Sequence, residues 1–130
     1  MKHSYLHRIA MGIALLFSAC SPSTKNFETV SIEQFQSVIT GPDVQIVDVR
    51  TVQEFLEGHI PGCLNIDVTQ PDFNRKADSL LNKSHKVAIY CRSGNRSKKA
   101  AAQLQEMGFK VVELGVGFNG WKQAGLPYEK

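Results

Sequence analysis

The sequence predicts an α/β fold in which a parallel sheet of about five strands carries helices on both faces. Strand-like and helix-like segments alternate throughout residues 27–130, which is the pattern of parallel sheets. The length of 130 residues and the hydrophobic and charged fractions of 42% and 21% suit one globular domain. Polar clusters follow two of the strand candidates, and binding groups of such folds gather beyond the carboxyl ends of strands.

The first half of this domain contains three strand candidates and two helix candidates. The strands are expected at residues 27–30, 44–49 and 63–66. Ser31 and Gln34 form a capping box that opens a helix with apolar positions at helical spacing. Thr51 and Glu54 form a second capping box, and the Gly58–Gly62 segment ends the helix that follows it.

The second half repeats the alternation. A helix with apolar positions at Phe73 and Ala77 precedes a clear strand at residues 86–90. The next helix ends at Gly108, and the last strand covers residues 110–114. A closing helix carries Phe118, Trp121 and Ala124.

The N-terminal segment has the pattern of an export signal. A basic start is followed by residues 9–19, an uncharged run of 11 residues that is shorter than the roughly 20 needed to span a bilayer. The run ends in Ser18-Ala19-Cys20, which resembles a bacterial lipoprotein signal, although Phe17 departs from the usual aliphatic residue. The alternative is ordinary secretion, with Cys20 as a small residue without a special role.

The lipoprotein resemblance implies cleavage before Cys20 and lipidation of its thiol. Residues 1–19 would be the signal peptide, residues 20–26 a lipid-anchored tether, and residues 27–130 the folded domain. The protein would then be held in the bacterial cell envelope, facing the periplasm or exposed at the surface. We expect this lipid to be its link to a membrane.

Charge and cysteine content exclude several classes of function. The formal net charge of +3 includes Lys2 and Arg8; without residues 1–19 the count is 13 basic against 12 acidic side chains. Such a balance gives no reason to expect nucleic acid as a partner. Three cysteines and four histidines without ligand spacing predict neither a disulfide scaffold nor a metal site, and we expect no cofactor.

A polar loop after the fourth strand has the features of a nucleophile's cradle. Cys91 lies between a strand and a helix start, with Ser97 as the expected N-cap, so free N–H groups point into the loop. Arg92 and Arg96 add positive charge, and Gly94 lets the backbone turn its N–H groups inward. We therefore expect an exposed Cys91 thiol with a pKa below the free value of about 8.5.

Asp48 and Arg50 follow the second strand, and the topology brings them near this loop. Arg96 needs a carboxylate to fix the loop, and Asp48 is the expected partner. We assign Asp48, Arg50 and Ser97 as supports of the loop.

Several ordered motifs together resemble the rhodanese family of sulfurtransferases. The loop matches the family's Cys-Arg-x-Gly-x-Arg-Ser pattern, and Asp48-Val49-Arg50 is similar to its first motif. The resemblance extends to Glu54-Phe55, Gly58-His59-Ile60-Pro61-Gly62, and Gly115 and Gly117 ahead of Trp121, where Val116 separates glycines that are usually paired. It covers residues 27 to about 126.

The resemblance implies transfer of sulfane sulfur through a persulfide on Cys91. A small anionic donor such as thiosulfate would supply the sulfur, and a thiol, cyanide or a protein would accept it. Arg92, Ser93, Gly94, Asn95 and Arg96 would form the substrate-binding loop around the catalytic cysteine.

Four other residues have ordinary structural explanations. Glu54 is explained as a helix cap, with an indirect contact to the active loop as the alternative. His59 is explained as a turn residue, because persulfide transfer needs no base. Cys63 is expected to be a small buried side chain that does not pair with Cys91. Lys98 is expected on a solvated helix face.

Two alternatives from other classes stay open. Phosphatases of the same fold place five residues between cysteine and arginine, whereas four separate Cys91 from Arg96, which suits a smaller group. A carrier that delivers persulfide sulfur to a protein partner without donor-specific catalysis would have the same sequence features.

Overall fold

The computed structural model describes residues 27–130 and contains one parallel five-stranded sheet. Its strands are β1 (Glu28–Val30), β2 (Val44–Asp48), β3 (Leu64–Asn65), β4 (Lys86–Tyr90) and β5 (Val111–Leu114), in the spatial order β1-β5-β4-β2-β3. The helices are α1 (Ile32–Ile39), α2 (Val52–Glu57), α3 (Phe73–Leu80), α4 (Asn95–Glu106) and α5 (Gly117–Gln123). The predicted fold class is confirmed, and each strand lies within one residue of its expected range.

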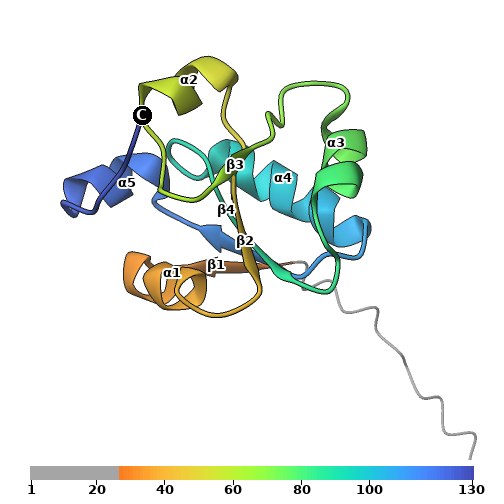
Figure 1. Cartoon of the computed structure of the whole chain (residues 1–130), viewed down its shortest axis with the longest axis horizontal. Helices are drawn as coiled ribbons and strands as arrows, with labels where there is room; N and C mark the ends of the chain where they lie inside the picture. The colour runs from red at the N-terminus through yellow and green to blue at the C-terminus, as the bar shows by residue number, and fades with distance from the viewer. Residues whose placement is uncertain (1–26) are drawn as a thin grey trace, which may run out of the picture.

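Helices cover both faces of the sheet, as Figure 1 shows. On one face, Phe73 and Ala77 of α3 and the apolar side of α4 pack against Val87 and Ile89 of β4. On the other face, α1 and α5 pack against the alternate β4 positions, which include Tyr90. Because successive strand residues point to opposite faces, β4 is buried on both sides and lies at the centre of the fold.

Both predicted capping boxes begin a helix, but only the first is complete. Ser31 and Gln34 form the complete reciprocal capping box. The Thr51 hydroxyl accepts the backbone N–H of Glu54, but the Glu54 carboxylate accepts the Thr51 hydroxyl and does not return to its backbone N–H. The second box is therefore half formed, and the carboxylate is available to other partners.

The expectation that Ser97 caps α4 is wrong. The N-cap is Gly94, whose left-handed φ of 102° turns the chain into the helix at Asn95. Ser97 consequently lies in the first turn of the helix with its side chain fully buried. Its hydroxyl is free to act inside the protein instead of at a helix end.

The C-terminal segment pairs with the connection between α2 and β3. His59 and Glu129 form an isolated antiparallel bridge, with backbone hydrogen bonds of 2.8 and 2.9 Å. The His59 ring is buried and stacks on Phe55 at 3.9 Å, and its Nδ1 lies 2.9 Å from the Phe55 carbonyl oxygen. This histidine links two segments of the fold, which is more than the turn role expected from the sequence.

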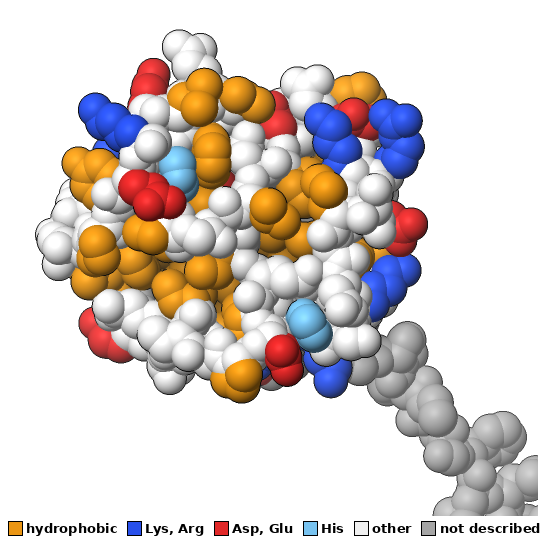
Figure 2. Space-filling view, in the orientation of Figure 1, with side chains coloured by type: hydrophobic (Ala, Val, Ile, Leu, Met, Phe, Trp, Pro, Cys, Tyr) orange, Lys and Arg blue, Asp and Glu red, His pale blue; other side chains and the backbone are white. Residues whose placement is uncertain are grey.

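The visible face of the molecule in Figure 2 has apolar side chains near its centre and lysine or arginine side chains around its margin. No helix within residues 27–130 is long and apolar enough to cross a membrane. The same residues contain no group of three or more histidine, cysteine, aspartate or glutamate side chains that could hold a metal ion.

Candidate active site

Cys91 directly follows β4 and continues its alternation. Val87, Ile89 and Cys91 belong to the cluster between the sheet and α4, so the thiol points toward the first turn of that helix. Only 1% of the residue is exposed, and the expectation of an exposed cysteine is wrong. The strand direction aims the side chain inward, and the backbone of the loop covers it.

The sulfur of Cys91 is surrounded by hydrogen-bonding groups of its own loop. The Gly94 N–H donates to Sγ at 3.1 Å, and Sγ lies 3.3 Å from the Ser97 hydroxyl oxygen. Burial alone would raise the pKa of the Cys91 thiol, but hydrogen bonds from Ser97 and from the backbone of Gly94 and Ser93 outweigh it. The net effect is a lowered pKa, in the direction the sequence predicts.

The first turn of α5 holds the backbone of the loop in place. The Phe118 and Asn119 N–H groups donate to the carbonyl oxygens of Cys91 and Arg92 at 2.8 and 3.0 Å. Gly117 has a φ of 61°, and a Cβ added to it would collide with the Arg92 carbonyl group. A close approach of two backbones therefore sets the shape of the loop, and only glycine fits there.

Arg96 is anchored by Glu54 and not by Asp48. The guanidinium donates to both carboxylate oxygens of Glu54, at 2.7 and 2.9 Å, and Arg92 adds a hydrogen bond of 3.2 Å. The hydrogen bonds from Arg96, helped by its charge, lower the pKa of Glu54 to about 2. Glu54 thus ties α2 to the loop in addition to its role at the start of α2.

The predicted Asp48–Arg96 pair fails because of strand alternation. Asp48 lies opposite Tyr90 in the sheet and points to the face covered by α1 and α5, whereas Cys91 points to the α4 face. Arg50 takes the Asp48 carboxylate instead, with a hydrogen bond of 2.7 Å, and donates to the Gly58 carbonyl oxygen at 2.6 Å.

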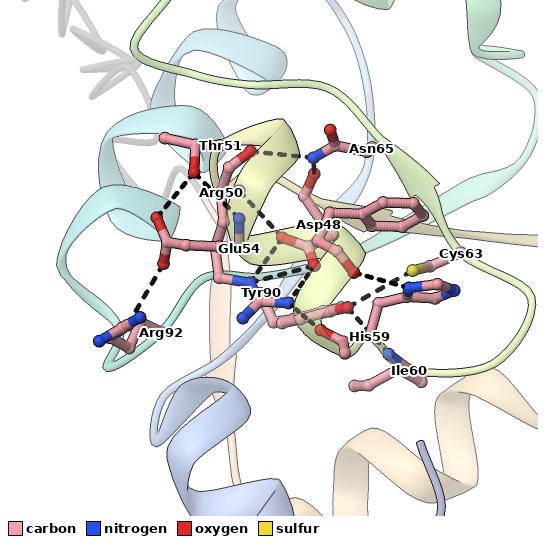
Figure 3. Close-up of polar contacts among 12 residues, drawn as sticks. Asp48, Arg50, Thr51, Glu54, His59, Ile60, Cys63, Asn65, Tyr90 and Arg92 are labelled. Atoms are coloured by element: carbon pink, nitrogen blue, oxygen red, sulfur yellow. Dashed lines mark hydrogen bonds and ion pairs between the residues drawn. The ribbon is translucent and has the colours of Figure 1, made fainter. Parts of the chain in front are cut away.

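Both members of this pair are buried, and Figure 3 shows it together with Glu54 and Arg92. The Arg50 guanidinium also lies 4.4 Å from the centre of the Phe118 ring. The Asp48–Arg50 pair therefore links the end of β2 to Gly58, on the face of the sheet opposite Cys91.

A largely basic hollow of about 230 Å³ adjoins the loop. Its charged lining comes from Arg50, Arg92, Lys122 and Lys130, against Glu54 and Glu57. Within the loop, Arg92, Ser93 and Asn95 are exposed, while Gly94 is buried. Arg92 is the loop residue that lines this hollow, so an anion can approach the loop from this side.

The second cysteine is separated from the first by the sheet. Cys63 packs against the cluster on the α1 and α5 face, with its sulfur 3.4 Å from the Tyr90 hydroxyl oxygen. Burial raises the pKa of the Cys63 thiol to about 11, so this thiol is unreactive near neutral pH. Its half-buried position fits the packing role expected from the sequence.

Glu113 is a residue of this region that the sequence analysis missed. Its carboxylate is fully buried and accepts the Ser97 hydroxyl at 2.6 Å, the Thr29 hydroxyl at 2.7 Å and the Lys98 ammonium at 3.3 Å. Lys98 is exposed, as expected, with 49% of its side chain accessible, and its ammonium reaches this carboxylate from the solvated side. A lone carboxylate within the apolar run of residues 110–114 was the available signal.

Comparison with known proteins gives a consistent result. The rhodanese-like domain family matches residues 31–124. Thiosulfate sulfurtransferase 18 of Arabidopsis thaliana is 35% identical over 120 residues, covering 82% of this chain and 88% of that protein. Bacillus subtilis YrkF, whose name gives it a proposed role as sulfur carrier, is 32% identical over 103 residues; the match covers 78% of this chain but only 54% of YrkF.

The solved structures agree with the sequence relatives. A crystal structure of a rhodanese-related protein from Thermoplasma volcanium superposes with a TM-score of 0.70 at 25% identity, covering 79% of this chain and 98% of that one. With its five parallel strands, its helices on both faces and its cysteine loop after β4, the chain belongs to the rhodanese-like domain family of sulfurtransferases.

Proposed function

We propose that this protein transfers sulfane sulfur from a small anionic donor such as thiosulfate to a thiophilic acceptor through a persulfide on Cys91. The observation that carries the proposal is the contact between the Cys91 sulfur and the Gly94 N–H, 3.1 Å apart, inside a loop bordered by two arginines. An N–H group directed at sulfur stabilises a thiolate, and an N–H group directed at the outer sulfur of a persulfide would stabilise that anion in the same way.

The reaction has two displacement steps. The Cys91 thiolate attacks the outer sulfur of thiosulfate, a new S–S bond forms, and the old S–S bond breaks with its electron pair leaving on sulfite. Cyanide or a thiolate then attacks the outer sulfur of the persulfide, and the electron pair of the breaking bond returns to Cys91. No proton has to move in either displacement, and no metal or cofactor takes part.

The loop residues have separate roles in this proposal. Arg92 is 55% exposed in its side chain and borders the basic hollow, so it can leave Glu54 to meet an anionic donor. Arg96 is held by two hydrogen bonds and fixes the loop. The backbone of Ser93, Gly94 and Asn95 forms the floor that receives the transferred sulfur.

Burial of Cys91 adds a requirement to the mechanism. With 1% of the residue exposed, a donor reaches the sulfur only when loop groups above it move aside.

Sulfur transfer by purified variants tests the function. The full chain should form thiocyanate from thiosulfate and cyanide, and mass spectrometry after donor treatment should find one added sulfur atom on the Cys91 peptide. Cys91→Ser should lose both signals, while the control Cys63→Ser should keep them. Turnover of thiosulfate by Cys91→Ser would reject the mechanism.

The carrier alternative is favoured by one comparison, the likeness to YrkF. A carrier would accept sulfur from a protein donor and show little activity with thiosulfate, yet still load Cys91. Persulfide on Cys91 without thiosulfate turnover would therefore select carriage over catalysis. The four-residue spacing between Cys91 and Arg96 keeps the phosphatase alternative behind both.

We propose that a lipid on Cys20 anchors the protein in the cell envelope. Residues 1–26 lie outside the part of the chain that the structure describes, so the support is the sequence pattern. The full-length protein should sediment with membranes, and Cys20→Ala should release it or block its processing. Wild-type protein recovered entirely in the soluble periplasmic fraction would reject the lipid anchor.

A further inference from the structure

A buried carboxylate lies directly behind the nucleophile and has no part in the displacement steps above. Glu113 belongs to β5, next to β4, and its register partner there is Ile89, two residues before Cys91. Both side chains point to the α4 face of the sheet. Glu113 is 0% exposed. Burying a carboxylate costs free energy unless hydrogen bonds or an ion pair compensate for the lost water.

Ser97 connects this carboxylate to the nucleophile. Its hydroxyl oxygen lies 2.6 Å from Glu113 Oε1 and 3.3 Å from Cys91 Sγ. A hydroxyl group has one proton to donate, so it cannot serve both neighbours at once. While the proton faces Glu113, Ser97 can only accept from the Cys91 thiol; a sulfur anion needs the same proton.

We propose that Glu113 is a positioning residue that controls, through the Ser97 hydroxyl, whether Cys91 rests as a thiol or acts as a sulfur anion. In the resting arrangement Ser97 donates to Glu113 and accepts from the thiol. The thiol loses its proton to solvent to form the thiolate; in the thiolate and persulfide forms the hydroxyl turns to donate to the sulfur, and Glu113 keeps the hydrogen bonds from Thr29 and Lys98. The inference rests on the proposed function, since it takes Cys91 as the nucleophile.

Charged groups around the pair limit how strongly Glu113 can act. From α4, the Lys98 ammonium reaches the Glu113 carboxylate at 3.3 Å, and its other hydrogen bond goes to the Gly94 carbonyl oxygen. The pKa of Arg96, also on α4, is raised mainly by its hydrogen bonds to Glu54 and further by the negative charge of Cys91. β1 contributes the neutral hydroxyl of Thr29. The Lys98 ammonium therefore offsets part of the negative charge of Glu113.

This arrangement protects the nucleophile between turnovers. A thiol is far less reactive toward oxidants than a thiolate, and Glu113 favours the thiol when the site is empty. Once the persulfide has formed, its outer sulfur is anionic, and the Ser97 hydroxyl, 3.3 Å from Cys91 Sγ, can turn its proton toward the sulfur pair. One hydroxyl then stabilises the loaded form and leaves the empty form guarded.

The test is the pH dependence of Cys91 alkylation by iodoacetamide in the full chain, followed on the Cys91 peptide by mass spectrometry. Glu113→Gln keeps the shape but removes the competing charge, and should lower the midpoint by about one pH unit. Thr29→Val leaves Glu113 with one donor fewer, so it should hold Ser97 harder and raise the midpoint. Opposite shifts cannot come from a general loosening of β5.

A third variant separates the hydroxyl from the electric field. Ser97→Ala should raise the midpoint, and in its background Glu113→Gln should shift the midpoint by less than half as much. A Glu113→Gln midpoint that does not fall, equal shifts with and without Ser97, or shifts of the same sign in Glu113→Gln and Thr29→Val would each overturn the proposal. Alkylation needs no sulfur donor, so these results decide it even if Cys91 transfers no sulfur.

Discussion

Arg96 and Glu54, 42 residues apart in the sequence, are joined by two hydrogen bonds of 2.7 and 2.9 Å that tie α4 to α2. The cysteine loop lies between the two helices and is closed by this pair. Arg92 touches the same carboxylate from the solvent side with a single hydrogen bond. Glu54 thus accepts hydrogen bonds from two arginines, the half-buried Arg96 and the more exposed Arg92.

Arg96→Ala should destabilise the fold by about 1–3 kcal/mol, because the Glu54 side chain is 16% exposed and loses its main partner. Arg92→Ala should cost less than about 1 kcal/mol, since its side chain is 55% exposed and Glu54 keeps Arg96. Urea unfolding of both variants measures the difference. Equal losses would contradict the assigned roles.

The same pair predicts a pH dependence of stability. The pKa of Glu54 is about 2 in the folded protein against an ordinary 4.5, so its contribution is complete above pH 4.5 and disappears as the pH falls toward 2. Glu54→Gln should therefore be less stable than wild type at pH 7 and nearly equal to it near pH 2. Glu57→Gln, exposed on the same helix, is the control and should differ equally little at both pH values.

Gly94→Ala and Gly117→Ala should each reduce sulfur transfer by at least about tenfold, because each added Cβ would collide with the backbone of a facing segment and displace the loop. Gly108 has a similar left-handed φ of 98° but nothing within 4 Å of an added Cβ. Gly108→Ala therefore separates backbone strain from displacement. It should lose stability and keep activity; equal activity loss in all three would reject the steric explanation.

The two thiols should differ in reactivity. At pH 7.5, mild peroxide or iodoacetamide should modify Cys91 and leave Cys63 intact, because the pKa of Cys63 is raised to about 11. Peptide mass spectrometry reads both sites. Tyr90→Phe removes the hydrogen bond of Cys63 and should leave the selectivity unchanged. A stoichiometric Cys63–Cys91 disulfide would contradict their placement on opposite faces of the sheet.

The sequence was sufficient for the fold and for the cysteine loop, since both depend on local patterns. Apolar runs mark β2 and β4, and the loop's residues are contiguous, so spacing alone brings them together. The residue that binds Arg96 depends instead on which way a side chain points. Asp48 and Glu54 both lie close to the carboxyl end of β2, near the cysteine loop. Asp48 is excluded as the partner of Arg96 only by the face of the sheet to which its side chain points.

Ser97 and Glu113 illustrate a second limit. The helix start was placed at Ser97 because serine is a common N-cap, but Gly94 turns the chain earlier and puts the hydroxyl inside the protein. Glu113 then becomes its partner across α4 and β5, a contact with no counterpart in local sequence. Burial of Cys91 has the same origin, since it follows from the direction in which β4 ends.

All five strands run in one direction, and this fixes how the domain is presented by whatever holds its N-terminus. The chain enters β1 at Glu28, at the amino ends of the strands, whereas Cys91 follows the carboxyl end of β4, about 10 Å away along the sheet. A domain suspended from its N-terminus therefore carries its reactive sulfur on the side remote from the suspension point, open to partners arriving from the opposite direction.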